Sequence, residues 1–475
     1  MTMTTPDWVK DAVFYQIFPD RFAQSRAVPK PSNLEAWESP PTRYGFKGGD
    51  LLGVVERLDY LVDLGVTAIY LNPIFRAASN HRYNTHDYYE VDPILGGNAA
   101  LRALVDAAHA RGMRVVLDGV FNHVGRGFFQ FNHLLECGGE SPYVDWFTAH
   151  SFPLSAYDRH ADLNYVGWFG SRALPKLNLH NPVVREYIFD VAEHWIRFGV
   201  DGWRLDAAEQ IEADGFWQEF RRRVKRINPE AYIVGEIWFP AERYLQGDQF
   251  DGVTNYLFMR PAVGFFGART LDNYVKQGHL QAPVPPLDAP GFAREIEAVL
   301  ARYPWEITLA QFNLLNSHDT PRFLTLVGGD ESALRLALLC LLTMPGAPNL
   351  YYGDELGLPG GPDPGCRGAM PWAQAEARGD LWCYTRQAIA LRKAHPALRR
   401  GTYATVLAEG DLLAYTRAFN GATVLVVLNA GTHPTAATLP VGGLSRLAFG
   451  ASSECAINAD HVQVVVPARS GIVVV

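Results

Sequence analysis

Residues 202–236 read GWRLDAAEQIEADGFWQEFRRRVKRINPEAYIVGE, and the order of elements in this segment points to one class of fold. GWRL at its start and YIVG near its end are short apolar runs rich in strand-forming side chains, and residues 214–227 between them have the spacing of an amphipathic helix. A strand, a helix and a strand in this order form a βα unit with parallel strands. A carboxylate follows each strand at once, Asp206 after the first and Glu236 after the second.

The same alternation of apolar runs and amphipathic stretches continues along the chain. Eight strands are predicted, a count that is typical of a TIM barrel. They cover residues 12–18, 66–71, 114–120, 202–205, 232–235, 252–257, 312–316 and 349–352. Helices are predicted between them, at residues 51–64, 98–111, 183–198, 214–227 and 331–344. A doubly wound sheet would use fewer strands and usually a G-x-G-x-x-G turn, and no such turn follows the first apolar run.

Two parts of the sequence depart from this pattern. Residues 124–179 are rich in Gly, Phe and Tyr and lack a clear period, which predicts a small domain inserted after strand 3. After residue 396, short alternating runs between Gly, Asn and Pro turns predict an antiparallel β-sandwich. The predicted fold is therefore α/β, with a (β/α)8 TIM barrel at residues 1–123 and 180–396, the inserted domain at 124–179 and a C-terminal β-sandwich at 397–475.

Composition limits the classes of function. Of the 475 residues, 48% are apolar and 19% are charged, which is typical of a globular chain. A net charge of −8 gives no general attraction to phosphate backbones or anionic lipid, so neither nucleic acid nor a membrane is expected as a partner. Five cysteines without a C-x-x-C pair predict neither a disulfide framework nor a zinc site. Because the start shows no signal peptide and no run approaches about 18 apolar residues, we expect a soluble cytoplasmic protein.

Acidic side chains gather where the predicted strands end. In a TIM barrel the chemistry takes place at the carboxyl ends of the strands, and Asp206, Glu236 and Asp319 follow strands 4, 5 and 7. One such aspartate alone could equally be a helix N-cap. Three acids with two histidines and an arginine at one rim are costly to bury without a ligand or a reaction. We therefore interpret this rim as a candidate active site.

Two carboxyl groups with unequal surroundings can share the cleavage of a glycosidic bond. One protonates the leaving oxygen while the other attacks the anomeric carbon, with the two groups about 5 Å apart in a retaining enzyme. Arg204 lies two residues before Asp206, on the same side of an extended strand, so we predict that Asp206 stays ionised and acts as the nucleophile. Glu236 is followed by Ile, Trp and Phe, which predicts a raised pKa and the role of the acid. Asp319, beside His318, is expected to hold sugar hydroxyls.

Four ordered motifs at these positions resemble the sequence signatures of the alpha-amylase family of glycoside hydrolases. They are DGVFNH at residues 118–123, GWRLD at 202–206, GEIW at 235–238 and NSHDT at 316–320. Two further segments are similar to the neopullulanase and cyclomaltodextrinase branch of this family. They are LPKLN at residues 174–178 and GGPDPGCRGAMPW at 360–372. The resemblance runs from about Val13 to the C-terminus.

This resemblance implies roles for individual residues. Asp206 matches the nucleophile of the family, Glu236 the acid/base and Asp319 the stabiliser of the transition state. Residues that match sugar-contacting positions are Tyr83 as the aromatic platform, His123, Arg204 and His318 at the cleavage subsite, Asp363 and Arg367 around the next glucose, and Trp238 on the leaving-group side.

The activity that the family implies is a retaining hydrolysis of α-1,4 glucosidic bonds, with α-1,6 bonds as an open alternative. It proceeds through a covalent glycosyl-aspartate intermediate. The implied substrates are maltooligosaccharides, cyclodextrins or pullulan, so the expected partner is an α-glucan oligosaccharide.

The sequence departs from the family pattern at positions that bear on specificity. Asn84 stands where an aspartate is usual, and Phe239 stands where a histidine is frequent in this branch. Glu209 and Gln210 stand where typical starch-degrading members have Lys and His. Since the chain begins almost directly at the first strand, we expect the extra N-terminal domain of the branch to be absent. The protein is then expected to be a monomer or a simple homo-oligomer that does not use such a domain.

Two alternatives stay open at the level of sequence. A glucanotransferase or a glucosyl isomerase would use the same site and differ in whether water or a sugar reaches the intermediate. A non-catalytic barrel used for binding is expected to lack one of the three acids, and all three are present. No cofactor is required by this chemistry. Asn122 matches a calcium ligand of many family members, but calcium takes six to eight oxygens, so we predict no metal site and keep Ca²⁺ as an alternative.

Overall fold

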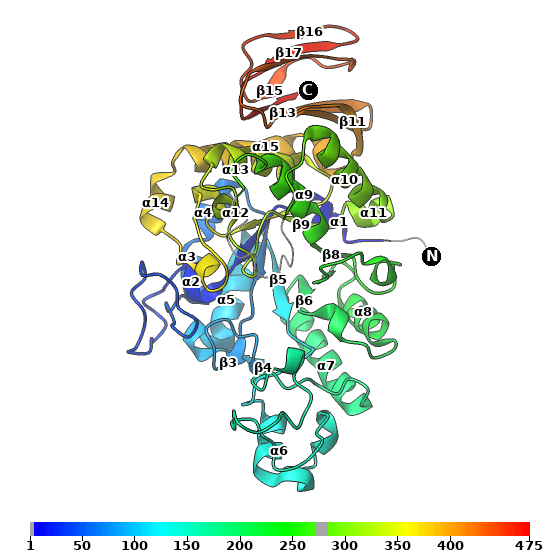
Figure 1. Cartoon of the computed structure of the whole chain (residues 1–475). Helices are drawn as coiled ribbons and strands as arrows, with labels where there is room; N and C mark the ends of the chain where they lie inside the picture. Colours follow the sequence, from blue (N-terminus) through cyan, green and yellow to red (C-terminus); the bar gives the residue numbers. More distant parts are fainter. Residues whose placement is uncertain (1–3, 272–283) are drawn as a thin grey trace.

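A closed barrel of eight parallel strands forms the body of the molecule (Figure 1). The computed structural model describes residues 4–271 and 284–475. Around the barrel the strand order is β1-β10-β9-β8-β7-β6-β5-β2. The bounds are β1 (Phe14–Ile17), β2 (Ala68–Leu71), β5 (Arg114–Gly119), β6 (Gly202–Leu205), β7 (Tyr232–Gly235), β8 (Gly252–Asn255), β9 (Phe312–Leu314) and β10 (Ala347–Tyr351). The predicted TIM barrel is therefore confirmed.

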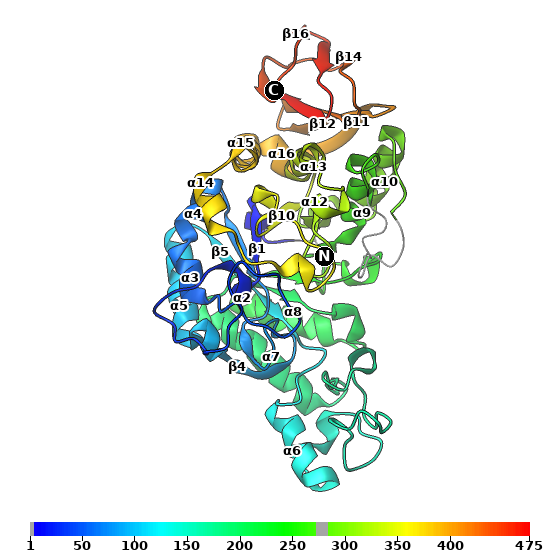
Figure 2. The same ribbon diagram turned by 60° about the vertical axis from the view of Figure 1, so that its left-hand side comes forward.

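Helices cover the outside of the barrel (Figures 1 and 2). The main ones are α5 (Gly97–Ala110), α7 (Pro182–Phe198), α8 (Phe216–Ile227), α13 (Glu331–Thr343) and α15 (Asp380–Ala394). Local residues set their limits, as α7 illustrates. The side chain of Asn181 accepts a hydrogen bond from the N–H of Val183 (2.9 Å) at its start, and Gly199 in the left-handed region (φ 111°) ends it. Inside this layer, β1, β6 and β7 are buried at every position, as expected for strands covered on both faces.

The helix predicted at residues 51–64 is two helices in the structure. They are α3 (Leu51–Glu56) and α4 (Leu58–Leu64), separated at Arg57. There the backbone leaves the helical region (φ −109°, ψ 6°), and the guanidinium carbon lies 4.2 Å from the centre of the Trp372 ring. A contact with a distant part of the chain therefore accompanies the break.

Two features next to the strands also differ from the prediction. The strand predicted at residues 252–257 ends at Asn255, where α9 (Tyr256–Phe266) begins. A short apolar run does not distinguish a buried strand from a buried helix, which explains the difference. After β2 the chain forms an antiparallel hairpin, β3 (Phe75–Ala77) with β4 (Thr85–Val91), that was not predicted.

The segment between β5 and α7 extends from one end of the barrel (Figure 1). It contains α6 (Phe129–Cys137) and short 3-10 turns. Isolated antiparallel bridges join it, at His123 with Lys176, Phe147 with Leu177, Ala149 with Tyr165 and Gly167 with Pro175. This short, irregular pairing fits the lack of periodicity in the sequence. The domain boundaries at residues 124 and 179 stay predictions.

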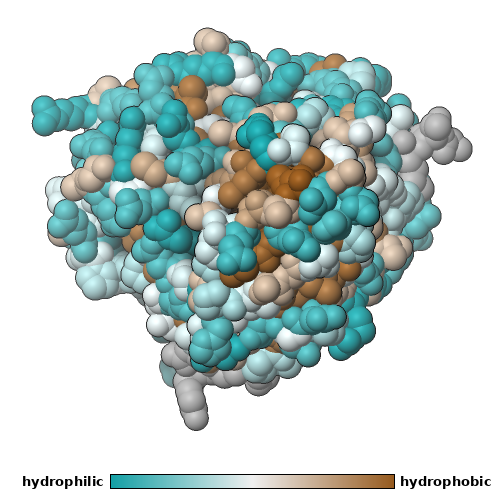
Figure 3. Space-filling view, turned by 90° about the horizontal axis from the view of Figure 1, so that it is seen from above, coloured by the Kyte–Doolittle hydropathy of each residue, from teal (hydrophilic) through white to brown (hydrophobic). Residues whose placement is uncertain are grey.

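The C-terminal part of the chain folds into two antiparallel sheets, at the end of the molecule opposite to α6 (Figures 1 and 2). One has the order β11-β12-β13-β18-β15 and the other β14-β17-β16. Their bounds are β11 (Thr402–Glu409), β12 (Leu412–Phe419), β13 (Ala422–Asn429), β14 (Thr435–Leu439), β15 (Leu447–Phe449), β16 (Cys455–Ile457), β17 (Val462–Val466) and β18 (Ser470–Val474). The sheets share a buried cluster that includes Leu412, Val427 and Val464, which confirms the predicted sandwich. Seen from this end, the surface is largely hydrophilic and carries one gathered hydrophobic patch (Figure 3).

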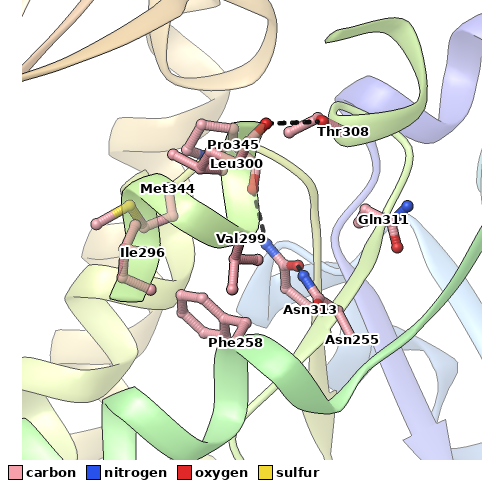
Figure 4. Close-up of a pocket in the computed structure, with 10 residues that line it drawn as sticks. All are labelled: Asn255, Phe258, Ile296, Val299, Leu300, Thr308, Gln311, Asn313, Met344 and Pro345. Carbon is pink, nitrogen blue, oxygen red and sulfur yellow. Dashed lines mark hydrogen bonds between the residues drawn. The ribbon is translucent and has the colours of Figure 1, made fainter. Parts of the chain in front are cut away.

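A small cavity lies among α9, α10 (Ala289–Ala301) and the residues around β9 (Figure 4). Its volume of about 10 Å³ is room for roughly one water molecule. Asn313 is hydrogen-bonded to two other residues that line the cavity. Its Oδ1 accepts a hydrogen bond from the amide of Asn255 (2.7 Å), and its Nδ2 donates to the carbonyl of Pro345 (2.7 Å). None of the residues predicted for the active site lines this cavity, so it is not the candidate site.

A buried carboxylate ties the first strand to the helix layer. Glu355 lies in the short turn Asp354–Leu356 after β10, and its Oε1 accepts hydrogen bonds from the hydroxyls of Tyr15 (2.8 Å) and Tyr60 (2.6 Å). Its other oxygen, Oε2, is buried and has no partner within the described residues. Burial raises the pKa of Glu355 to about 7.

We expect Glu355 to make the protein less stable as the pH rises through neutrality. The pKa of Glu355 is higher in the folded chain than in the unfolded one. Its contribution to the free energy of unfolding is therefore present in full below the pKa of the unfolded chain and is lost as the pH rises to about 7. Glu355→Gln removes this titration. The difference in the free energy of unfolding between wild type and variant should therefore shift by about 2 to 3 kcal/mol from pH 5 to pH 8. Urea denaturation across that range measures it, and a difference that does not change with pH contradicts the prediction.

Candidate active site

The predicted acids lie at one end of the barrel. Asp206 directly follows β6 and Glu236 directly follows β7, and these strands pair side by side with Leu205 opposite Gly235. Asp319 lies in the loop after β9. The side chains of Asp206 and Glu236 are 10% and 9% exposed, and that of Asp319 is 18% exposed. All three acids are therefore nearly buried but not sealed from solvent.

One guanidinium group joins three carboxylates at this rim. Arg204, on β6, places Nη1 3.0 Å from Asp118 Oδ1 and 3.0 Å from Asp206 Oδ1. Its Nη2 lies 2.8 Å from Glu236 Oε1. The second oxygen of Glu236 accepts a hydrogen bond from the backbone N–H of Ala207 (2.9 Å). Asp206 and Glu236 thus approach the same cation from adjacent strands, an arrangement suited to two groups that act on one bond.

The prediction that Arg204 keeps Asp206 ionised in preference to Glu236 does not hold, because the guanidinium is shared with Glu236 and Asp118. Burial, and then the neighbouring Glu236 carboxylate, raise the pKa of Asp206 well above its usual range against the effect of Arg204. The Asp206 carboxyl group therefore holds a proton more readily than an exposed aspartate does. Which of them is the nucleophile and which the acid stays a prediction.

Removing the shared cation should destabilise the fold in a pH-dependent way. We expect Arg204→Met to lower the free energy of unfolding at pH 7.5 by about 3 to 5 kcal/mol, because buried carboxylates lose their partner. Without the cation, the pKa of Asp206 in the folded protein rises further. Asp206 is then protonated at low pH, where it needs no cationic partner, so the loss of unfolding free energy should be smaller at pH 5 than at pH 7.5. Denaturation at both pH values measures the effect, and an equal loss at both contradicts it. Arg102→Met, at a side chain 43% exposed, is the control and should cost less than about 1 kcal/mol.

Asp319 lies between a histidine and an arginine. Its Oδ2 is 3.0 Å from Nε2 of His318, and its Oδ1 accepts a hydrogen bond from Nη2 of Arg367 (3.3 Å). Burial alone would raise the pKa of this carboxyl group, but the hydrogen bond from His318 and the guanidinium groups of Arg367 and Arg204 hold the pKa well below its usual range. Arg367 also donates to the carbonyl of His318 (2.9 Å) and pairs with Asp363 (2.9 Å). The structure thus brings these four sequence-predicted residues together.

Tyr83 lies in the loop between β3 and β4 and reaches the same rim. Its hydroxyl donates to Asp118 Oδ2 (2.8 Å) and lies 2.6 Å from Nε2 of His318. The rings of Tyr83 and His318 are parallel, with centres 5.4 Å apart. The carbonyl of Tyr83 accepts a hydrogen bond from Nε2 of His123 (3.1 Å). Burial lowers the pKa of His123 to about 3, so this ring is neutral.

Two of the sequence-predicted site residues, Trp238 and His123, each stack on another aromatic ring. Trp238, just after β7, stacks on Tyr256 with ring centres 3.4 Å apart. Trp168, in the segment between β5 and α7, stacks on His123 with ring centres 4.9 Å apart. Its neighbour Phe169 is 80% exposed and has a positive φ of 46°. Sequence reasoning missed Tyr256, Trp168 and Phe169, because the sequence does not distinguish a packed aromatic from one at the rim of a site.

One polar residue of the barrel interior was also missed. Gln16, on β1, places Nε2 2.8 Å from Nδ1 of His318. Asn72, directly after β2, places Nδ2 3.1 Å from the same nitrogen. A glutamine in the middle of the apolar run AVFYQIF is the signal that could have identified Gln16.

Whether the described part of the chain can hold a metal ion depends on how its His, Cys, Asp and Glu side chains are grouped. Within residues 4–271 and 284–475, no group of three or more His, Cys, Asp or Glu side chains could hold a metal ion. Asn122, which matches a calcium ligand of the family, has a buried Oδ1 that accepts no hydrogen bond from any described residue. One such oxygen is far from the six to eight that calcium takes. The described helices also include none that is long and apolar enough to cross a membrane.

Comparisons with known proteins agree with one another. A family model described as Alpha amylase, catalytic domain, matches residues 16–379. Cyclomaltodextrinase from Geobacillus thermopakistaniensis is 44% identical over 440 residues, which cover 92% of this chain and 71% of that protein. Neopullulanase 2 from Thermoactinomyces vulgaris is 44% identical over 431 residues, which cover 90% and 70%. Among solved structures, the debranching enzyme from Nostoc punctiforme matches with a TM-score of 0.92 and 48% identity over the full length of both chains.

Proposed function

Since the chain belongs to the alpha-amylase family of glycoside hydrolases, we propose that it hydrolyses α-glucosidic bonds in oligosaccharides with retention of configuration at the anomeric carbon. The observation that supports this proposal most strongly is the shared contact of Asp206 and Glu236 with one guanidinium. A retaining mechanism needs its two carboxyl groups about 5 to 5.5 Å apart on one cleft. Two acids on adjacent strands, bound to the two terminal nitrogens of Arg204, are suited to that requirement.

In the proposed first step, a carboxylate oxygen of Asp206 forms a bond to the anomeric carbon as the bond to the leaving oxygen breaks. Glu236 gives its proton to that oxygen, so the leaving sugar departs as a neutral alcohol and a covalent glycosyl ester of Asp206 remains. In the second step Glu236 takes a proton from water, whose oxygen displaces Asp206. This step requires a proton on Glu236 and an ionised Asp206 in the complex, because the leaving oxygen takes the proton while a lone pair of Asp206 attacks the anomeric carbon.

Asp319 is proposed to stabilise the positive charge that develops on the sugar ring. The depressed pKa of Asp319 keeps it ionised in the working range, so its negative charge is in place before the transition state forms. Tyr83 offers an aromatic face to the same sugar. Asp363, whose side chain is 51% exposed while that of Arg367 is 9% exposed, has oxygens open to hydroxyls of the next glucose.

The proposed substrates are maltooligosaccharides, cyclodextrins and pullulan. The names of the similar proteins, cyclomaltodextrinase and neopullulanase, support ring-shaped and pullulan-type α-glucans. The name debranching enzyme supports α-1,6 bonds in addition to α-1,4 bonds. A glucanotransferase or glucosyl isomerase on the same site stays the alternative, because the same glycosyl ester can be given to a sugar.

Two measurements on the purified protein test this proposal. Proton NMR of the first products of maltotriose hydrolysis should show the α-anomer, and a β-anomer as the first product would refute retention. The oligosaccharide products decide between the two activities: glucose and maltose indicate hydrolysis, whereas oligomers longer than maltotriose indicate transfer. A panel of cyclodextrin, pullulan, starch and short maltodextrins then ranks the substrates, and inactivity on all of them would reject an α-glucan hydrolase.

A further inference from the structure

The surroundings of His318 fix the position of its ring proton. The side chain is 2% exposed, and its two nitrogens face different groups. The Nδ1 atom faces the amide groups of Gln16 (2.8 Å) and Asn72 (3.1 Å). The Nε2 atom faces the hydroxyl of Tyr83 (2.6 Å) and the carboxylate of Asp319 (3.0 Å). The direction of each of these hydrogen bonds follows from the other hydrogen bonds that the partner of His318 makes.

The network begins at a carboxylate that only accepts hydrogen bonds. Asp118 accepts a hydrogen bond from Nη1 of Arg204. Its Oδ2 lies 2.6 Å from the hydroxyl of Tyr70 and 2.8 Å from that of Tyr83. Burial raises the pKa of both tyrosines well above the usual range, so both keep their protons and donate them to Asp118. Each hydroxyl can then only accept hydrogen bonds from its other neighbours.

This constraint orients two amide groups in turn. One end of the Asn72 amide lies 3.0 Å from the Tyr83 hydroxyl and 3.3 Å from the Tyr70 hydroxyl, so this end is the NH₂ group. The other end, Oδ1, lies 3.0 Å from the amide of Gln16, so Gln16 presents its own NH₂ group there. Reversing either amide would set acceptor against acceptor or donor against donor.

The same NH₂ groups of Gln16 and Asn72 contact Nδ1 of His318. A ring nitrogen that faces two donors accepts hydrogen bonds and carries no proton, so the ring proton lies on Nε2. There it is shared between the Tyr83 hydroxyl, which already donates to Asp118, and the Asp319 carboxylate.

We propose that Gln16 and Asn72 are positioning residues that hold His318 neutral, with its single ring proton on Nε2 and directed at Asp319. The catalytic meaning of this inference rests on the proposed function, while the tautomer itself does not. A neutral ring gives Asp319 a hydrogen bond without a full positive charge, which leaves the carboxylate available to sugar hydroxyls. Because the donor is oriented before substrate arrives, no reorganisation is needed in the transition state.

The other groups around His318 agree with a neutral ring. Its backbone carbonyl accepts hydrogen bonds from Nε of Arg367 (2.9 Å) and Sγ of Cys366 (3.1 Å), so a guanidinium already supplies positive charge on this side. His81, whose ring stacks on Tyr83, has its pKa lowered to about 3 by burial and adds no charge. The carboxylate of Asp319 contacts the ring on the Nε2 side, whereas both contacts to Nδ1 are amides.

Nitrogen NMR of the full-length protein without substrate tests the tautomer directly. The protein is labelled with ¹⁵N-histidine, and the His318 signals are identified by their loss in His318→Gln. We expect a protonated Nε2 and an unprotonated Nδ1 at pH 7. A proton on Nδ1 at pH 7, alone or together with one on Nε2, overturns the proposal. Since no sugar is added, this outcome is separate from the question of whether the protein hydrolyses α-glucans.

A variant that reverses the polarity at Nδ1 tests the positioning role. Gln16→Glu puts a carboxylate in place of the amide with little change in size. We expect Nδ1 to be protonated in this variant at pH 7, and kcat on maltotriose to fall by about 100-fold with KM changing less than about threefold. Gln311→Glu makes the same change at another buried position, 2% exposed, and should leave the His318 signals and kcat per folded molecule unchanged. A wild-type His318 spectrum in Gln16→Glu, or an equal spectral change in Gln311→Glu, overturns the proposal.

Discussion

We expect the Asp206→Asn enzyme to lose nearly all turnover while keeping its fold. An amide does not attack the anomeric carbon as a carboxylate does, so kcat on maltotriose should fall by about 10⁴-fold or more. The fold should survive because asparagine has almost the same size and Arg204 keeps its contacts with Asp118 and Glu236. Burial already raises the pKa of Asp206 well above its usual range, so its charge disfavours folding at high pH. The free energy of unfolding at pH 8 should therefore not decrease in the variant.

Asp251→Asn is the matched control for this experiment. Asp251 is fully buried just before β8, at the opposite end of that strand from the active site, and pairs with Arg221 (2.7 Å) and Lys225 (2.9 Å). It should lose stability and keep kcat per folded molecule, the reverse of Asp206→Asn. In the wild type, a 2-fluoro maltosyl fluoride should label Asp206, as peptide mass spectrometry would show. A label on another residue, or turnover in Asp206→Asn above about 1% of wild type, would refute the nucleophile assignment.

How much of the fold could be predicted depends on how local each signal is. The limits of β6, α8 and β7 follow from apolar runs and helical periodicity, which are properties of neighbouring positions, and these elements lie where they were predicted to within two residues. The break at Arg57 coincides with a contact to Trp372, on a distant part of the chain. Neighbouring positions carry no information about such a contact.

The same limit applies to the site. Acids at strand ends were predictable, because the carboxyl ends of parallel strands in a barrel meet at one rim. The sharing of Arg204 was not, since a spacing of two residues shows only that Arg204 and Asp206 lie on one side of one strand. Glu236 reaches the guanidinium from the next strand. The role of Gln16 was even less predictable from the sequence, because it depends on amide and hydroxyl orientations that are set by other strands.

We expect Glu236→Gln to lose activity in proportion to the proton that the leaving group requires. A sugar alcohol departs slowly without protonation, so kcat/KM on maltotriose should fall by about 10³-fold. A nitrophenolate leaves readily as an anion, so kcat/KM on nitrophenyl α-maltoside should fall by less than about tenfold. The rate constants for a series of aryl α-maltosides measure this directly, and the dependence on the pKa of the leaving phenol should become steeper in the variant.

This dependence on the leaving group separates a proton donor from a residue that only supports the site. Glu236 accepts a hydrogen bond from the backbone N–H of Ala207 and contacts Arg204, so its loss could also lower activity by disturbing both neighbours. Such a disturbance would slow all substrates alike, because it acts before any proton moves. Glu193→Gln, at a buried glutamate of α7 that pairs with Arg226 (2.8 Å), is the control and should leave the dependence as in the wild type. Equal losses on maltotriose and on nitrophenyl α-maltoside in Glu236→Gln would assign Glu236 to support and require another donor for the proton.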